Sequence, residues 1–171
     1  MRITFKQNPY GKTNMIVTDA IPLFRNLTGI DHTNYPNPFL KTFTLDIPSQ
    51  YVEELRSRGY KLRLSHNPND PQHEQYLLDV RIAFKMTKDD PYNPKVTAHT
   101  DDGDIKLDVD SINKYQHENL EKINFVASEP WSKDPNAGGG ACYANIVDIY
   151  VEGSPYKSNY EIENSPDQVF F

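Results

Sequence analysis

Residues 76–86, YLLDVRIAFKM, decide the fold class, because their side chains alternate between apolar and polar along the chain. The apolar side carries Leu78, Val80, Ile82 and Phe84, and the polar side carries Asp79, Arg81, Ala83 and Lys85. A period of two predicts a β-strand with one buried and one solvated face. The chain around this strand is therefore expected to form a half-solvated sheet.

Other short segments alternate in the same way or are rich in β-branched and aromatic residues, and turn residues separate them. Pro22 interrupts one such segment, which predicts an edge strand or a bulged strand. The additional strands are expected in residues 2–6, 13–27, 39–47, 60–64, 94–99, 105–109, 122–128 and 141–152. Loops and turns are expected in residues 67–72 (NPNDPQ), 101–104 (DDGD) and 129–140 (EPWSKDPNAGGG).

Two short helices are expected between the strands. Residues 51–59 (YVEELRSRG) predict the first, with Ser49 as N-cap and Gly59 as C-cap. Residues 110–119 (DSINKYQHEN) predict the second, with Asp110 or Ser111 as N-cap. The later helix precedes the last pair of strands.

Many short strands with one or two short helices indicate a mainly β protein. A small OB-fold-like β-barrel, closed or partly open, fits the pattern best, and a β-sandwich is the alternative. We expect an N-terminal arm in residues 1–12, the OB-fold-like domain in residues 13–153, and a disordered acidic C-terminal tail in residues 154–171.

Charge is distributed unevenly along the 171 residues, whose net charge is -6. Residues 1–100 carry 13 Lys and Arg against 10 Asp and Glu, whereas residues 101–171 carry 5 against 14. The first part is therefore mildly basic and the second strongly acidic. The first ten residues contain no apolar signal region, and no window of the sequence approaches the apolar length needed to span a membrane. We therefore expect a cytoplasmic protein.

Residues that could support catalysis or metal binding do not form a known pattern. The five histidines lack ligand spacing, Cys142 is the single cysteine, and the aspartates of residues 101–110 do not match a calcium loop. The glycines of residues 138–140 precede a strand rather than a helix, unlike those of a phosphate-binding loop. We therefore expect no catalytic residue, metal or cofactor, and a protein that is not an enzyme.

Cationic residues beside aromatic ones are the remaining candidates. Single-stranded nucleic acids need cations for their phosphates and flat rings for their unpaired bases. The same pattern also arises on the solvated face of any sheet. The candidate binding residues are Phe24, Arg25, Lys41, Phe43, Tyr60, Lys61, Arg63, Arg81, Lys85, Trp131 and Lys133.

The tail ends in acidic residues followed by aromatic ones, with Asp167, Phe170 and Phe171 as the candidate partner-binding residues. Exposed apolar residues at a free terminus are unfavourable unless they are used. Two explanations stay open, since the two phenylalanines could fold back on the domain or bind a partner protein. An acidic tail could also compete with DNA for a basic groove.

The order of several short motifs resembles that of a family of bacteriophage single-stranded-DNA-binding proteins with an OB-fold. The similar segments, in residues 18–152, are FRNLTG at 24–29, FTLDIP at 43–48, VEEL at 52–55, GYKL at 59–62, the strand at 76–84, PKV at 94–96, PW at 130–131 and GACY at 140–143.

The resemblance implies binding of single-stranded DNA without strong sequence preference during phage DNA replication or recombination, in the cytoplasm of the infected bacterium. It implies replication or recombination proteins as partners of the tail, and Arg25 facing a phosphate track. A homo-oligomer stays open. An alternative from another class is a phage interaction module or host-protein inhibitor acting through its acidic surface. A hydrolase that uses Mg²⁺ on the carboxylates of residues 101–110 is a third reading.

Overall fold

The computed structural model describes residues 1–131 and 139–153, and the predicted acidic tail lies outside these residues. The protein is mainly β, as predicted, with two short helices and a sheet that is not closed. The elements are β1 (Arg2–Gln7), β2 (Thr13–Ala20), β3 (Phe24–Asn26), β4 (Leu40–Asp46), α1 (Ser49–Ser57), β5 (Arg63–Asn67), β6 (Asp70–Ala83), β7 (Lys95–Thr100), β8 (Gly103–Leu107), η1 (Ser111–Gln116), β9 (Leu120–Ala127) and β10 (Cys142–Val151).

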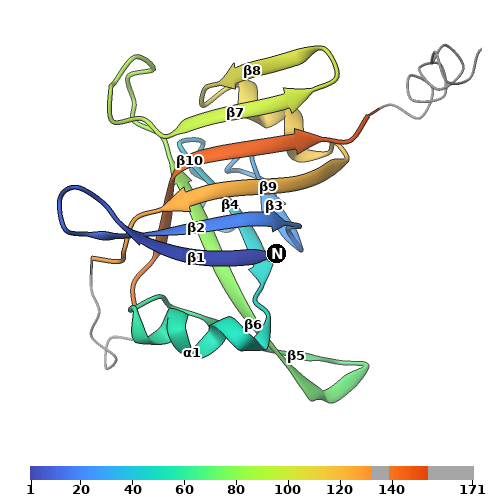
Figure 1. Ribbon diagram of the computed structural model, residues 1–171. Helices are drawn as coiled ribbons and strands as arrows, with labels where there is room; N and C mark the ends of the chain where they lie inside the picture. The colour runs from blue at the N-terminus through green and yellow to red at the C-terminus, as the bar shows by residue number, and fades with distance from the viewer. Residues whose placement is uncertain (132–138, 154–171) are drawn as a thin grey trace, which may run out of the picture.

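Strand β10 joins the two halves of the sheet. Its first residues pair in parallel with β6, and the rest of the strand lies between β9 and β7. The strand order is β1-β2-β9-β10-β6-β4-β3, with β5 beside β6, β7 beside β10, and β8 beside β7. In Figure 1, β4 and β6 run steeply across the layer formed by the other long strands. This arrangement is consistent with a partly open OB-fold-like barrel.

The N-terminal residues predicted as an arm form β1, which pairs antiparallel with β2 from Arg2 to Gln7. The interruption at Pro22 is confirmed, since β2 ends at Ala20 and β3 begins at Phe24. Arg58 lies with its guanidinium 4.0 Å from the Phe5 ring centroid, which links the end of α1 to β1.

The hairpin of β5 and β6 differs from the prediction. Residues 67–72 were expected to be a loop, but the turn uses only Pro68 and Asn69, and Asn67 pairs with Asp70. Strand β6 consequently begins six residues before the predicted start at Tyr76. Pairing with β5 overrides the turn preference of the Pro- and Asn-rich sequence, because strand propensity depends strongly on context.

The first helix begins and ends at caps other than the predicted ones, whereas the second begins at a predicted N-cap. Ser49 is the first residue of α1, and the N-cap is Pro48, with no side-chain capping bond. Gly59 follows the C-cap Arg58 with a φ of 93°, which suits glycine and lets the chain leave the helix. The second helix, η1, is a 3₁₀ helix whose N-cap is Asp110, as one of the two predicted options had it. The Asp108 carboxylate accepts hydrogen bonds from the backbone N–H groups of Asp110 and Ser111.

Candidate functional site

The register of four strands separates the candidate residues into a core row and an outer row. Arg25 on β3 pairs with Phe43 on β4, Phe43 with Val80 on β6, and Val80 with Cys142 on β10. The next row along these strands is Asn26, Thr42, Arg81 and Tyr143. Successive residues of a strand point to opposite faces, so the second row lies on the outer face of the sheet.

The prediction that Lys41 and Phe43 lie on an exposed surface is wrong. Both side chains are buried, and Phe43 contacts Phe125 edge-to-face with ring centroids 5.3 Å apart. Lys41 shares the inward parity of Phe43, and its Nζ donates hydrogen bonds to Thr28 O at 3.0 Å and Asn113 Oδ1 at 2.9 Å. Burial lowers the pKa of Lys41. These two residues hold the core and η1 together and offer no surface to a ligand.

Arg25 is held by main-chain carbonyl groups. Its Nε donates to Gln116 O at 2.8 Å, and its Nη2 donates to Glu118 O. In return, Gln116 Nε2 donates a hydrogen bond to Arg25 O at 2.8 Å, and Gln116 Oε1 accepts one from Leu27 N at 2.5 Å. Burial is the main cause that lowers the pKa of Arg25. Arg25 therefore connects β3 to the end of η1, and its guanidinium is engaged by these carbonyl groups rather than facing a phosphate track as expected.

Tyr60 also points inward, contrary to its prediction as a surface residue. Its side chain is buried, and its Oη donates a hydrogen bond to Ser128 O at 3.2 Å. Burial raises the pKa of Tyr60 well above its usual range. Lys61 is exposed beside it, and its backbone N–H donates to Gly140 O at 3.1 Å. Lys133 lies outside the described residues, as do Asp167, Phe170 and Phe171.

Arg63 and Asp79 form an ion pair on the outer face. Arg63 Nε lies 2.6 Å from Asp79 Oδ2, and Arg63 Nη2 lies 2.9 Å from Asp79 Oδ1. The Thr44 hydroxyl donates a third hydrogen bond to Asp79 at 2.7 Å. Burial alone would raise the pKa of Asp79, but the hydrogen bonds from Arg63 and Thr44 outweigh it and lower the pKa. Phe24, which pairs with Thr44, is 64 % exposed on the same face.

Arg81 and Tyr143 form the second pair on this face. The Arg81 Nη1 donates to Tyr143 Oη at 3.2 Å, and the guanidinium lies 5.7 Å from the ring centroid. Arg81 is exposed, and Tyr143 is half-buried. The pair therefore presents a cation and an aromatic ring at one place.

A hollow of about 350 Å³ adjoins Tyr143. Trp131 is 99 % exposed at its border, and Tyr92 is 84 % exposed. The lining residues are Ala83, Lys85, Tyr92, Pro94, Trp131, Tyr143, Ala144 and Asn145. The hollow thus collects three aromatic side chains and one lysine from the β6–β7 loop, the segment after β9 and the start of β10.

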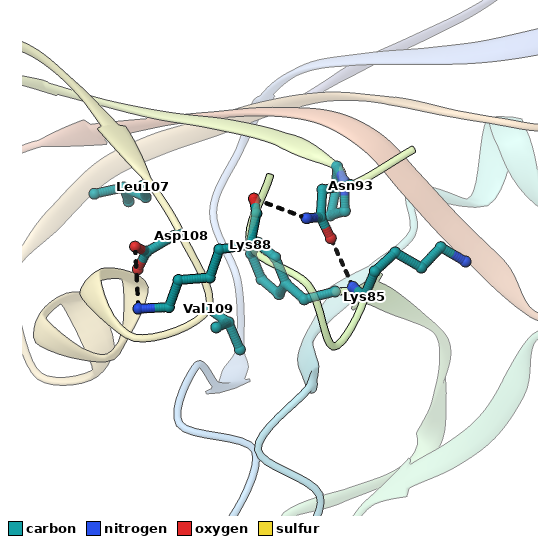
Figure 2. Close-up of a pocket in the computed structure, with 8 residues that line it drawn as sticks. Lys85, Lys88, Asn93, Leu107, Asp108 and Val109 are labelled. Carbon is teal, nitrogen blue, oxygen red and sulfur yellow. Dashed lines mark hydrogen bonds and ion pairs between the residues drawn. The ribbon is translucent and has the colours of Figure 1, made fainter. Parts of the chain in front are cut away.

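The loop between β6 and β7 carries Lys85 and Tyr92 to this hollow, and internal contacts hold it in place. Asn93 accepts a hydrogen bond from the Lys85 backbone N–H at 2.6 Å and donates to Lys88 O at 3.1 Å (Figure 2). Lys88 Nζ reaches Asp108 and Asp110, at 3.7 and 2.5 Å. In Figure 2 the Lys85 side chain points away from the Lys88–Asp108 contact. The loop is therefore built to present Lys85 outward.

The outer face is defined by seven residues from six segments: Phe24, Arg63, Arg81, Lys85, Tyr92, Trp131 and Tyr143. The sequence predicted five of them and missed Tyr92 and Tyr143. Tyr92 lies in a segment that reads only as a loop. Tyr143 joins the face through the pairing of β10 with β6, which connects segments 62 residues apart.

Residues 1–131 and 139–153 include side chains of the metal-binding and nucleophilic types. No group of three His, Cys, Asp or Glu side chains in these ranges could hold a metal ion. Cys142 is buried, and its burial raises the pKa of the thiol to about 12. In the same described ranges no helix has the length and apolar character needed to cross a membrane.

Comparisons with known proteins add no further assignment, since the chain matches no protein-family model, no curated protein and no solved structure.

Proposed function

We propose that the protein binds single-stranded DNA, without strong sequence preference, across the outer face. The pairing of Arg81 with Tyr143 beside Trp131 is the observation that carries this proposal. Cations neutralise backbone phosphates, and aromatic rings stack on bases of any sequence. The outer face offers both kinds of group close together in space, since Arg81 contacts Tyr143 and Tyr143 lines the same hollow as Lys85 and Trp131.

The charge of this face supports the same function. It carries three cations, Arg63, Arg81 and Lys85, against two carboxylates, Asp46 and Asp79. Arg63 engages Asp79, and Asp46, on the same face of β4 as Thr44, accepts a hydrogen bond from Gln75. The exposed rings also favour a single strand over a duplex, because bases in a duplex are stacked on one another and offer no free faces. Hydrogen-bond readout of particular bases needs several convergent polar groups. The outer face is instead dominated by rings and cations, which suits binding without sequence preference.

The wider setting follows from the resemblance described above. We propose a role in phage DNA replication or recombination, in the host cytoplasm, with the acidic tail recruiting partner proteins through Asp167, Phe170 and Phe171. The competing function is that of an interaction module or host-protein inhibitor that uses its acidic residues. Asp101 and Asp102 in the β7–β8 turn, with Asp104 at the start of β8, place three carboxylates at one end of this hairpin, which is the acidic surface that such a function would use.

The two functions are distinguished by titrating labelled oligonucleotides with the full-length protein, with the fluorescence anisotropy of the label as the measure of binding. Matched lengths of oligo-dT, a mixed-sequence single strand, duplex DNA and RNA are compared at about 50 and 200 mM salt. We expect both DNA single strands to bind alike, more tightly than duplex, and with affinity that falls with salt. Absence of binding to every nucleic acid would contradict the proposal and favour the interaction module.

A further inference from the structure

The turn between β1 and β2 is held by its own hydrogen bonds. Asn8 Oδ1 accepts from the backbone N–H groups of Tyr10 and Lys12, both at 3.0 Å. Asn8 N donates to Lys12 O at 2.7 Å, and Gly11 N donates to Asn8 O at 3.0 Å. Gly11 has a φ of 81°, a conformation that suits glycine. The turn is therefore a fixed platform rather than a loose connection.

This platform presents an aromatic ring and a cation to solvent. Tyr10 is 90 % exposed, and Lys12 is exposed two residues later. None of the ion pairs among the described residues involves Lys12. Both groups are thus available to a ligand without first breaking a contact with a carboxylate.

Lys12 connects the turn to the outer face. Its Nζ lies 5.9 Å from the centroid of the Trp131 ring, within the range of a cation–π contact. Trp131 also borders the hollow that Tyr143 and Lys85 line. In Figure 1 the β1–β2 turn projects on the side of the molecule where β9 ends, shortly before Trp131. The turn and the outer face therefore meet at Trp131.

We infer that the β1–β2 turn is a second contact region for the single strand, in which Tyr10 stacks on a base and Lys12 binds a phosphate. The inference rests on the proposed function and extends its site beyond the outer face. A strand that crosses Arg81, Tyr143 and Trp131 continues over Lys12 to Tyr10. The internal hydrogen bonds of the turn reduce the entropy lost when the strand binds, because little of the backbone must be ordered.

This arrangement predicts a dependence on the length of the strand. A short oligonucleotide that occupies only the outer face gains nothing from the turn, whereas a longer one reaches Lys12 and Tyr10. Removing a stacking ring lowers affinity about 5-fold or more. Removing one phosphate contact makes the slope of log K against log salt shallower by about 0.7 for a single strand.

The experiment measures oligo-dT binding to full-length protein as the length increases from about 4 to 16 nucleotides, the range of site sizes for one OB-fold. Tyr10→Ala and Lys12→Ala are compared with the unaltered protein. Tyr35→Ala and Lys106→Ala are the matched controls, since Tyr35 is 88 % exposed in another loop and Lys106 is exposed on β8. Thermal unfolding of each variant checks that the fold is kept.

We expect both turn variants to weaken the binding of long strands only, with Lys12→Ala also reducing the salt slope, while both controls bind as the unaltered protein does. If both turn variants bound oligo-dT of every length as tightly as the unaltered protein, the inference would be overturned, while the proposed binding at the outer face would stand. Failure of the unaltered protein to bind at any length would overturn both the proposed function and this extension. The two failures are therefore distinguishable.

Discussion

Arg81 and Tyr143 are direct neighbours on β6 and β10, and the guanidinium Nη1 donates a hydrogen bond to the phenol oxygen at 3.2 Å. The pair forms where β10 leaves β6 and turns toward β9, so it marks the junction between the two halves of the sheet. A flat ring and a cation fixed at this junction are the core of the proposed single-strand site.

Tyr143→Ala is predicted to weaken binding of oligo-dT by about 1–3 kcal/mol, which is the contribution of one stacked base. Tyr143→Phe keeps the ring and loses only the bond from Arg81, so its loss of affinity is expected to be smaller. Anisotropy with a labelled oligonucleotide measures both. Equal losses in the two variants would show that the hydroxyl group matters and that the ring does not stack.

Arg81→Ala is predicted to make the salt dependence of binding shallower by about 0.7 in the log–log slope, as expected for one lost phosphate contact on a single strand. Lys106→Ala, on exposed β8, is the control and is expected to leave the slope unchanged. An Arg81→Ala variant with weaker binding but an unaltered slope would contradict a phosphate contact.

Lys41→Ala is predicted to lower the free energy of unfolding by about 2–4 kcal/mol, because it leaves a cavity and removes the donor to Thr28 O and Asn113 Oδ1. Lys41→Met fills more of the space and is expected to cost less. Urea denaturation measures both variants. A fully stable Lys41→Ala protein with a reduced salt slope of DNA binding would instead return Lys41 to the binding surface.

Arg25→Ala is predicted to destabilise the protein without changing the salt slope of binding. The two carbonyl groups that it engages, Gln116 O and Glu118 O, would lose a charged donor, at a cost of about 1–3 kcal/mol. Urea midpoints and the oligo-dT salt titration are measured on the same variant. A reduced slope at unchanged stability would show that Arg25 contacts phosphate after all.

His99 is predicted to make the stability of the protein depend on pH, because it joins β7 to β8 and β10 through two carboxylates. Its Nδ1 lies 2.8 Å from Asp104 Oδ1 and its Nε2 lies 2.8 Å from Asp148 Oδ1. Only the protonated ring donates to both, and the hydrogen bond to Asp148 is the main cause that raises the pKa of His99. The imidazole ring of His99 also stacks on the Tyr150 ring, with the two ring centroids 4.4 Å apart.

Because the pKa of His99 is higher in the folded state, its stabilisation is fully present below the unfolded value of about 6.5 and is lost as the pH rises through the folded value. His99→Gln is therefore predicted to destabilise the protein more at about pH 5.5 than at about pH 8.5. Urea denaturation of both proteins at the two values tests this. A difference that stays constant or grows with pH would contradict the assigned role.

The mainly β fold was predictable because local alternation is strong in β4, β6 and β9. The length of β6 was not predictable, since residues 70–72 belong to the predicted loop and the predicted strand starts only at residue 76, whereas pairing with β5 extends β6 back to Asp70. Lys41, Phe43 and Leu45 are alternate residues of β4 and therefore share its inward face. A buried lysine is rare, however, and its partners Thr28 and Asn113 are brought together only by tertiary structure.

The candidate site was only partly predictable for a similar reason. Arg63, Arg81 and Lys85 lie on the solvated side of their segments, where local periodicity places them. Tyr143 and Tyr92 come to the same face through the parallel pairing of β10 with β6 and the fold of the β6–β7 loop. Such long-range pairings leave no local pattern in the sequence.

The most direct test of the central claim follows the fluorescence of Trp131, the single tryptophan, while the full-length protein is titrated with oligo-dT at low and moderate salt. We predict quenching that saturates, weakens as salt increases, and shifts to higher oligonucleotide concentration in Tyr143→Ala. Unchanged fluorescence together with unchanged anisotropy of the labelled strand would contradict single-strand binding at the outer face.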